Sequence, residues 1–171
     1  VRDRIGYVPQ KGILFSGTID SNIRYGKPEI TDAQVKEAAE VAQATEFIDT
    51  KPEKYESPVS QGGTNVSGGQ KQRLSIARAI AKDPEIFIFD DSFSALDFKT
   101  DSQLRKALKE YTKDATTVIV AQRISTILGA DQIIVLDDGH MAGIGTHKEL
   151  MANCEVYQQI ARSQLSEEEL A

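Results

Sequence analysis

The chain has 171 residues, of which 40% are hydrophobic and 27% charged, and its formal net charge at pH 7 is −6. This length is enough for one domain with its own core, or for a large part of a bigger domain. Non-specific binding to nucleic acid requires a basic face, so the negative charge argues against a nucleic-acid partner. The single cysteine excludes an internal disulfide, and the two histidines argue against a His/Cys zinc site.

Turn residues and apolar periodicity divide the first half of the chain. The predicted segments are a strand (residues 5–8), a loop (11–30), a helix (31–50), an irregular loop (51–66) and a second helix (67–82). Thr31 and Gln34 form a capping-box pattern at the start of the first helix. Asp83 and Pro84 stop the second helix, because proline cannot continue it.

The second half alternates strands with helices. The predicted segments are a buried strand (residues 86–89), a helix (99–112), two further strands (116–121 and 133–136), the second arm of a hairpin (140–145) and a last helix (147–164). Cys154 falls inside that last helix, and we expect the tail from Ser166 to Ala171 to be a frayed end. The alternation predicts an α/β fold with a largely parallel sheet flanked by helices.

Two adjacent carboxylates, Asp90 and Asp91, follow the apolar run IFIF. Ligands of α/β folds gather at the carboxyl ends of parallel strands, which is where Asp90 would lie. A carboxylate there can hold the Mg²⁺ of a nucleotide, and the next residue can position an attacking water. Taken alone, the dipeptide is explained more simply as a solvated turn after a strand.

The segment Ser67-Gly68-Gly69-Gln70 adds a second signal. Ser67 and Gln70 match a capping box, and the two glycines leave the first backbone N–H groups of the helix unshielded. Bare amides at a helix N-terminus attract anions, which the helix dipole also favours. A capped helix without a ligand is the alternative, but the strand that ends at Asp90 follows this helix, and the combination favours phosphate binding.

In this order the motifs resemble the nucleotide-binding domain of ABC transporters, most closely the exporter type. Residues 66–70 (VSGGQ) look like the signature motif, Ile86–Asp90 like the Walker B strand and Ser94–Asp97 like the D-loop. Gln10, followed by LFSGTI, looks like the Q-loop glutamine of exporters. The resemblance covers residues 3–162.

The resemblance implies that ATP and Mg²⁺ bind between two such domains, because each site joins one domain to the signature helix of the other. It also implies a transmembrane-domain partner and a place on the cytoplasmic face of the membrane. The implied metal-binding residues are Asp90 and Gln10, the catalytic ones Asp91, Gln122 and Gln10, and the nucleotide-contacting ones Ser67, Gly68, Gly69, Gln70 and Asp97.

The phosphate cradle of the family, Walker A, has the pattern G-x-x-x-x-G-K-[ST], and no stretch of the sequence matches it. In the only Gly-Lys pair, Gly26-Lys27, Pro28 replaces the required Ser or Thr. We therefore expect an incomplete ABC ATPase domain, the C-terminal part of a larger one. Its expected parts are a core strand with the Q-loop (residues 1–12), a helical subdomain with the signature motif (13–84), the C-terminal part of the ATPase core (85–165) and a tail (166–171).

Two residues depart from the family pattern. Asp91 stands where a catalytic glutamate is usual, and its carboxylate is drawn back by about one C–C bond length, roughly 1.5 Å. A general base needs a contact of about 2.6–3.2 Å, so this retreat matters. Gln122 stands where a switch histidine is usual, and it cannot carry a positive charge. With the intact signature motif, these residues predict the degenerate half of a heterodimeric exporter, which hydrolyses ATP slowly at its own site.

Two other classes of ABC protein are disfavoured, and one alternative stays open. ABC ATPases of chromosome structure and repair carry a long coiled coil between the Q-loop and the signature motif, and none separates Gln10 from Ser67. Ribosomal ABC proteins usually carry two domains and basic linkers, and the exporter-like LFSGTI disfavours them. The last alternative is a non-catalytic fragment that cannot bind ATP alone and only self-associates or pairs with a partner domain.

Overall fold

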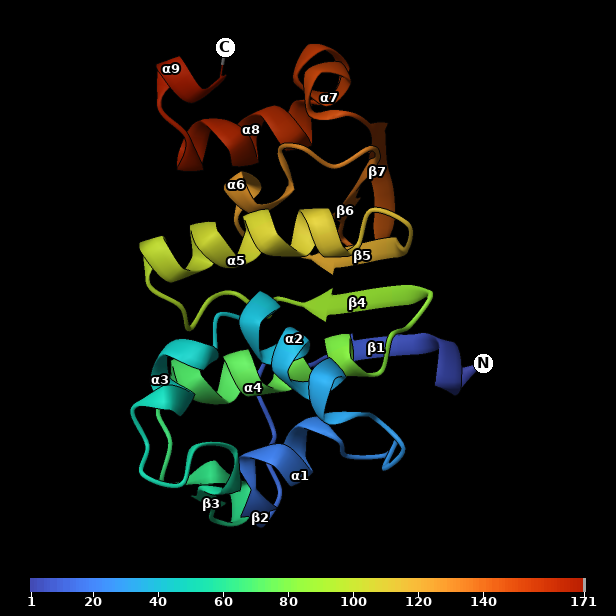
Figure 1. Ribbon diagram of the computed structural model, residues 1–171. Helices are drawn as coiled ribbons and strands as arrows, with labels where there is room; N and C mark the ends of the chain where they lie inside the picture. The colour runs from blue at the N-terminus through green and yellow to red at the C-terminus, as the bar shows by residue number, and fades with distance from the viewer. Residues whose placement is uncertain (171) are drawn as a thin grey trace. The chain divides into compact units, whose positions relative to one another are not determined.

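The computed structural model describes residues 1–170, and its contacts divide the chain into two compact units that part between Val120 and Ala121. Strands and helices alternate along the chain; three strands of the first unit form a parallel sheet, and its two shortest strands form a separate antiparallel pair (Figure 1). The predicted α/β fold class is therefore confirmed. The finer division into a core strand, a helical subdomain and a C-terminal core stays a prediction.

The first unit holds most of the regular structure. Its strands are β1 (Ile5–Val8), β2 (Gly17–Thr18), β3 (Pro58–Val59), β4 (Ile86–Asp90) and β5 (Thr116–Val120). Its α-helices are α1 (Ile19–Ile23), α2 (Asp32–Val41), α3 (Thr45–Asp49), α4 (Gly68–Ala81) and α5 (Phe98–Tyr111). Short 3₁₀ turns cover Arg2–Arg4, Lys54–Glu56 and Gln61–Gly63.

The first unit contains a parallel three-stranded sheet with the strand order β1-β4-β5. Alternate residues of β1 and β4 form a buried face on which α4 packs, and Val8, Phe87 and Phe89 on this face are at most 1% exposed. Gly6 lets α4 approach closely, because a Cβ there would stand only 3.2 Å from Ala79 O of that helix. Burial of this face fixes the register of β4, and with it the point where β4 ends.

Arg78 of α4 fastens the loop that follows β1. Its Nε donates to Asn22 O (2.8 Å), its Nη1 to Ile13 O (2.8 Å) and its Nη2 to Asn22 Oδ1 (2.9 Å). The guanidinium also lies over the stacked rings of Phe15 and Tyr25, 5.3 and 5.6 Å from their centroids. Desolvation lowers the pKa of Arg78, but the guanidinium stays charged at neutral pH.

Replacing Arg78 by Ala should destabilise the first unit by about 2–3 kcal/mol, because several charge-assisted hydrogen bonds to one loop are lost together. Urea denaturation measures the change in the free energy of unfolding. Arg162→Ala is the control, since Arg162 is exposed on the surface of the second unit and its loss should cost no more than about 0.5 kcal/mol. Equal stabilities of the two variants would show that Arg78 does not anchor the loop.

The helix predicted over residues 31–50 is two helices. α2 ends at Val41 and α3 begins at Thr45, and between them Gln43 has a left-handed φ of 57°. Ala42 and Ala44 on either side are both fully buried. The turn lets both alanines enter the core, so tertiary packing outweighs the helix propensity of this alanine-rich segment.

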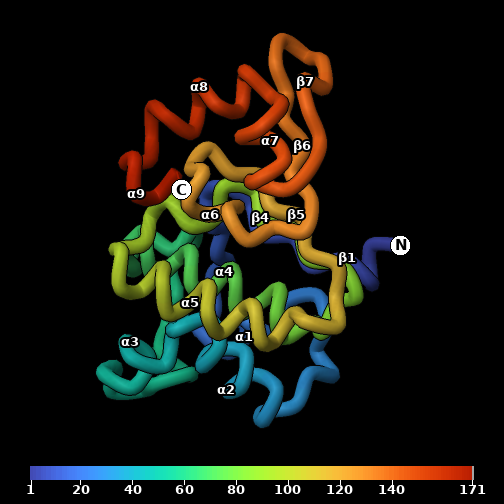
Figure 2. The backbone as a smooth tube through the Cα atoms, turned by 90° about the horizontal axis from the view of Figure 1, so that it is seen from above, coloured from blue at the N-terminus to red at the C-terminus, as the bar shows by residue number. Residues whose placement is uncertain are grey.

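The second unit begins with α6 (Ile124–Ile127), followed by the antiparallel hairpin of β6 (Ile133–Asp137) and β7 (His140–Gly145). The predicted turn at its tip is confirmed, since Asp138 and Gly139 have φ values of 45° and 76°. The chain continues through α7 (His147–Asn153), α8 (Glu155–Gln164) and α9 (Glu167–Leu170), as Figure 2 traces.

Two predictions for the C-terminal segment are wrong. The single helix over residues 147–164 is interrupted at Cys154, whose extended backbone (φ −119°, ψ 105°) separates α7 from α8 while its side chain stays buried. The tail is not frayed up to Leu170, because Ser166 and Glu169 hydrogen-bond in the manner of a capping box and start α9. Ala171 lies outside the described residues.

Candidate functional site

The two carboxylates after the apolar run lie at the carboxyl end of β4, as predicted. Gln10 Nε2 donates to Asp91 Oδ2 (3.2 Å), so the structure brings together two of the predicted site residues that lie far apart in the sequence. Tyr7 Oη donates to Asp90 Oδ2 (3.2 Å). Partial desolvation and this hydrogen bond raise the pKa of Tyr7. The phenol is therefore a stable donor that orients Asp90 at neutral pH.

Sequence reasoning missed Tyr7. The signal that could have found it is the period of the strand, since Tyr7 alternates with the buried Gly6 and Val8 and therefore faces the opposite side of the sheet. In the parallel register Tyr7 lies opposite Ile88, which is two residues before Asp90 on the same face of β4. The pairing of β1 with β4 had to be known first.

The backbone after β4 is held from both neighbouring strands. The Asp91 N–H donates to Val120 O (2.8 Å) at the end of β5, and the buried Ser92 donates from Oγ to Val8 O (2.7 Å) at the end of β1. Asp91 itself has a left-handed φ of 47°, a conformation that Asp and Asn tolerate better than most residues. The Asp91 carboxylate is thus presented from a fixed backbone.

The start of α4 has the predicted capping box. Gln70 N donates to Ser67 Oγ and Ser67 N donates to Gln70 Oε1, both over 3.2 Å. A Cβ on Gly68 would meet no atom within 4 Å, whereas one on Gly69 would lie 3.3 Å from Ala95 O. The N-terminus of α4 is therefore open at Gly68 and closely packed at Gly69, against the predicted D-loop.

Asp97 caps α5. Thr100 donates to it twice, from its N–H to Oδ1 (2.9 Å) and from its Oγ1 to Oδ2 (2.7 Å). These hydrogen bonds lower the pKa of Asp97, so the carboxylate is ionised at neutral pH. The next residue, Phe98, is 86% exposed.

Gln122 belongs to the second unit and follows the end of β5 by two positions. Its side chain is exposed, while its backbone carbonyl accepts a hydrogen bond from Gln164 Nε2 (2.8 Å). The segment therefore combines a free side chain with a tethered backbone.

The end of β4, where the predicted metal-binding residues Asp90 and Gln10 stand, has the kind of donors that suit a magnesium ion bound together with a nucleotide. Among residues 1–170 no group of three or more His, Cys, Asp or Glu side chains could enclose a metal ion. Magnesium in nucleotide sites is usually held by one or two carboxylates together with substrate phosphates, and it keeps several waters. The carboxyl end of β4 meets this requirement and does not provide an all-protein cage.

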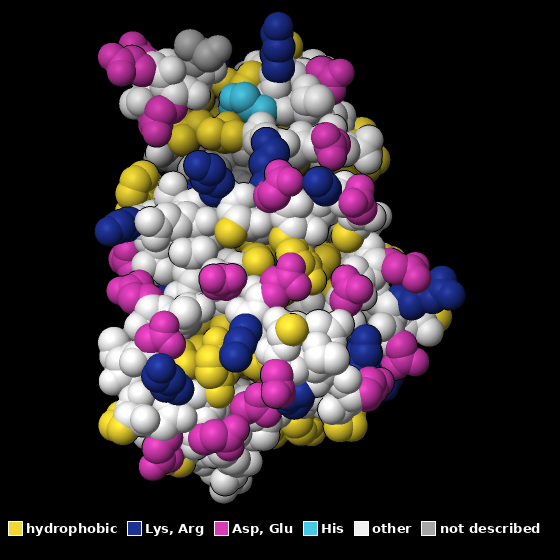
Figure 3. Space-filling model, in the orientation of Figure 1, with side chains coloured by type: hydrophobic (Ala, Val, Ile, Leu, Met, Phe, Trp, Pro, Cys, Tyr) yellow, Lys and Arg dark blue, Asp and Glu magenta, His cyan; other side chains and the backbone are white. Residues whose placement is uncertain are grey.

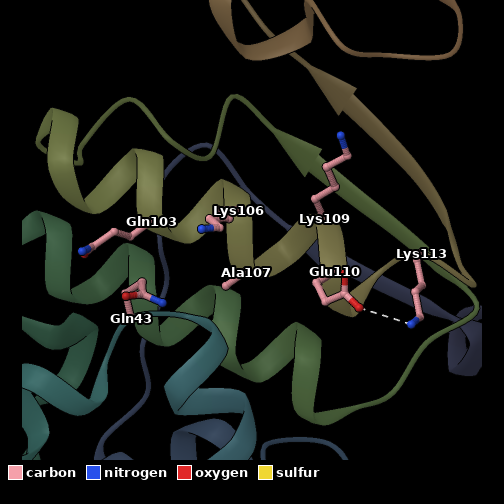
Figure 4. Close-up of a pocket in the computed structure, with 7 residues that line it drawn as sticks. All are labelled: Gln43, Gln103, Lys106, Ala107, Lys109, Glu110 and Lys113. Atoms are coloured by element: carbon pink, nitrogen blue, oxygen red, sulfur yellow. Dashed lines mark hydrogen bonds and ion pairs between the residues drawn. The ribbon is translucent and has the colours of Figure 1, made fainter.

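Other surface features of the first unit lie apart from these motifs. Figure 4 shows a shallow groove along α5 that holds none of the predicted site residues; it is lined by Gln43, Gln103, Lys106, Ala107, Lys109, Glu110 and Lys113. On the face shown in Figure 3, acidic and basic side chains are interspersed. Across the part of the chain that the structure describes, no helix is long and apolar enough to pass through a bilayer.

Comparison with known proteins identifies the family. The family described as ABC transporter matches residues 1–94. An uncharacterised ABC transporter ATP-binding protein of Mycobacterium tuberculosis (strain H37Rv) is 48% identical over 163 residues, which are 94% of this chain and 28% of that protein. A putative multidrug export ATP-binding/permease protein of Staphylococcus aureus (strain NCTC 8325) is 47% identical over 160 residues, with the same two coverages of 94% and 28%.

A solved structure agrees with these relatives. The structure of a bacterial Atm1-family ABC exporter with ATP bound matches with a TM-score of 0.92 and 38% identity over 97% of this chain and 29% of that one. The chain thus spans less than a third of the length of the relatives that it matches. The motifs at β4 and α4, the family match and the shared fold lead to one conclusion: this chain belongs to the ABC transporter family.

Proposed function

We propose that this chain is part of the ATP-binding and ATP-hydrolysing motor domain of an ABC exporter, which couples ATP to export across a membrane. The observation that carries the proposal is the joining of Gln10 to Asp91 at the carboxyl end of β4, beside Asp90. Relatives named as multidrug export proteins and an exporter structure with ATP bound support it.

In this proposal each residue at the end of β4 has its own task. Asp90 and Gln10 would hold Mg²⁺, and the ion bound with ATP would neutralise charge on the phosphate oxygens. Tyr7 orients the Asp90 carboxylate through the 3.2 Å hydrogen bond. Asp91 accepts a proton from the attacking water, and Gln122 donates a hydrogen bond to the terminal phosphate.

The signature helix serves a second nucleotide-binding domain. Ser67, Gly68, Gly69 and Gln70 start α4, and the open approach to Gly68 supports a role for its bare amides at the partner's ATP. Asp97 would lie at the seam between the two domains, next to the exposed ring of Phe98. Because Asp91 and Gln122 are weaker than the usual glutamate and histidine, we infer a heterodimer in which this chain's own site is slow.

The remaining partner is the transmembrane domain of the same exporter, which would place the chain at the cytoplasmic face of the membrane. The exposed Ile13, Phe15 and Tyr25 form an apolar surface that follows Gln10 in the chain and is braced by Arg78. Such a surface supports contact with another domain. It would pass movement of that domain to the Gln10 loop.

Titration calorimetry of Mg-ATP into the full-length protein tests the proposal. We expect Asp90→Asn to weaken Mg²⁺-dependent binding by about 10- to 100-fold, because a metal-binding carboxylate becomes a neutral amide. The control is Asp138→Asn at the exposed tip of the β6–β7 hairpin, which should bind like the unchanged protein. Unaltered binding by Asp90→Asn would exclude Asp90 from the metal site.

The second candidate, a fragment that cannot bind ATP alone, is favoured by the absence of a Walker A pattern in these residues. The same titration into the 171-residue chain decides between them for this polypeptide. The absence of detectable binding would mean that the function belongs to the larger protein only. Micromolar binding would mean that another loop or a second copy supplies the phosphate contacts.

A further inference from the structure

A single side chain, Gln164 at the end of α8, holds the backbone of the segment that carries Gln122. Its Nε2 donates to Gln122 O (2.8 Å), and its Oε1 accepts from the Ile124 N–H (2.8 Å). All of these residues belong to the second unit. One amide group therefore forms hydrogen bonds with the main chain on both sides of Arg123, and this pair of hydrogen bonds is called the grip below.

The start of α6 explains why such a grip is needed. The first N–H groups of a helix have no partner inside the helix, and a side chain at the N-cap usually accepts from one of them. Arg123 occupies the N-cap of α6 and its side chain makes no capping hydrogen bond. Gln164 supplies the missing acceptor from 40 residues away in the sequence.

Both ends of this grip rest on buried residues. Ile124 is 4% exposed and packs into the core of the second unit. On α8, Tyr157 and Ala161 are buried in the same core, and the Tyr157 hydroxyl is hydrogen-bonded to His147 Nδ1 (2.7 Å). The Gln164 amide is thus presented from a helix that is itself anchored.

The chemistry selects glutamine at this position. The grip uses one donor and one acceptor on the same planar group, which only Asn and Gln provide among the side-chain amides and carboxylates. Glu would keep the acceptor for Ile124 but would place a negative oxygen against the Gln122 carbonyl. Ala would remove both contacts.

We propose that Gln164 is a positioning residue for Gln122. By holding the Gln122 carbonyl it fixes the backbone from which the Gln122 side chain reaches the nucleotide. The inference rests on the proposed role of Gln122 at the terminal phosphate, and it adds a residue outside the sequence motifs to that site. Small displacements of a group that contacts the reacting atoms cost large factors in rate, so a tether of this kind matters.

Hydrogen exchange of the full-length protein, measured by mass spectrometry on peptides that cover residues 121–125, tests the inference. Without nucleotide, Gln164→Ala should speed exchange there about fivefold, because the Ile124 amide loses its acceptor. With a non-hydrolysable Mg-ATP analogue, the unchanged protein should gain protection in this segment, and Gln164→Ala should gain none. Gln164→Glu should keep the Ile124 amide protected and still fail to respond to the analogue.

Gln158→Ala is the matched control. Gln158 lies on the same helix, and its Nε2 donates to Met151 O (2.8 Å), so its loss removes a comparable contact without touching residues 121–125. Exchange and the response to the analogue should both stay as in the unchanged protein. Unaltered exchange in Gln164→Ala without nucleotide would overturn the tether. If the tether loosens as expected but the unchanged protein gains no protection from the analogue, the role of Gln122 at the nucleotide fails, and with it the positioning role.

Discussion

Replacing Asp91 by Glu and Gln122 by His together should raise ATP hydrolysis at this chain's own nucleotide site by about tenfold or more. General-base catalysis contributes factors of about 10² to 10⁴, and a carboxylate held one methylene too short forfeits part of that contribution. The histidine adds a donor that can carry positive charge beside the terminal phosphate. The measurement is steady-state hydrolysis by the assembled full-length protein in which the partner's own catalytic base has been removed.

The backbone conformation at Asp91 makes the change to Glu slightly destabilising, although turnover is expected to rise. Its φ of 47° suits Asp, and a longer side chain without Asp's local hydrogen bonding is less favourable there by about 1 kcal/mol. Asp91→Glu should therefore lower thermal stability slightly while it raises turnover. Asp114→Glu, at an exposed turn before β5, serves as the control for a simple change of length. Unchanged turnover in the double variant would refute the degenerate-site account.

Replacing Gly68 by Val should reduce ATP hydrolysis of the assembled protein by about 100-fold, because a branched side chain would cover the bare amides at the start of α4. Removing one well-placed donor at a developing negative charge costs about 10² to 10³ in rate. The fold should tolerate the change, since a Cβ at Gly68 meets no atom within 4 Å. Loss of rate with unchanged thermal stability would assign the effect to the ligand contact.

Gly129→Val is the matched control for this experiment. Gly129 also has open space around its Cβ position and lies after α6, away from the start of α4 in the sequence. The control should hydrolyse ATP at the unchanged rate. Equal losses in the two glycine variants would mean that added bulk acts through the fold and not through the signature helix.

The parts of the fold that sequence predicts well are those with a local cause. The capping boxes at Thr31, Ser67 and Thr146 mark the starts of α2, α4 and α7, and each is formed in the structure. The unbroken apolar run before Asp90 predicts a strand of a parallel sheet buried on both faces. The strand is formed, but only its Phe87 and Phe89 face is fully buried, and Ile86 and Ile88 on the other face are half-buried. The left-handed turn at Asp138 and Gly139 follows from turn chemistry alone.

The errors have a non-local cause. The breaks at Gln43 and Cys154 occur in segments with good helix formers. Both breaks place side chains in a core whose other residues are distant in the sequence, so local helix propensity does not predict them. α1 is too short for its apolar period to be read, although Ile19 and Ile23 are both fully buried. Where these helices begin and end depends on packing partners from elsewhere in the chain.

The candidate site divides in the same way. Asp90, Asp91 and the Ser67–Gln70 segment could be predicted because each has a short motif with a physical reason. Tyr7 and Gln164 could not, because Tyr7 reaches Asp90 only through the pairing of β1 with β4, and Gln164 reaches residues 122–124 only through the packing of α8. Positioning residues of this kind carry no motif of their own.

Steady-state ATP hydrolysis of the assembled full-length protein, compared between Asp91→Asn and Gly68→Val, tests the central claim most directly. If the signature helix serves the partner's ATP while the site at Asp91 is slow, Asp91→Asn should keep at least about half of the rate, and Gly68→Val should lose about 100-fold. A loss in Asp91→Asn as large as that in Gly68→Val would mean that this chain's own site carries the turnover, and it would contradict the account.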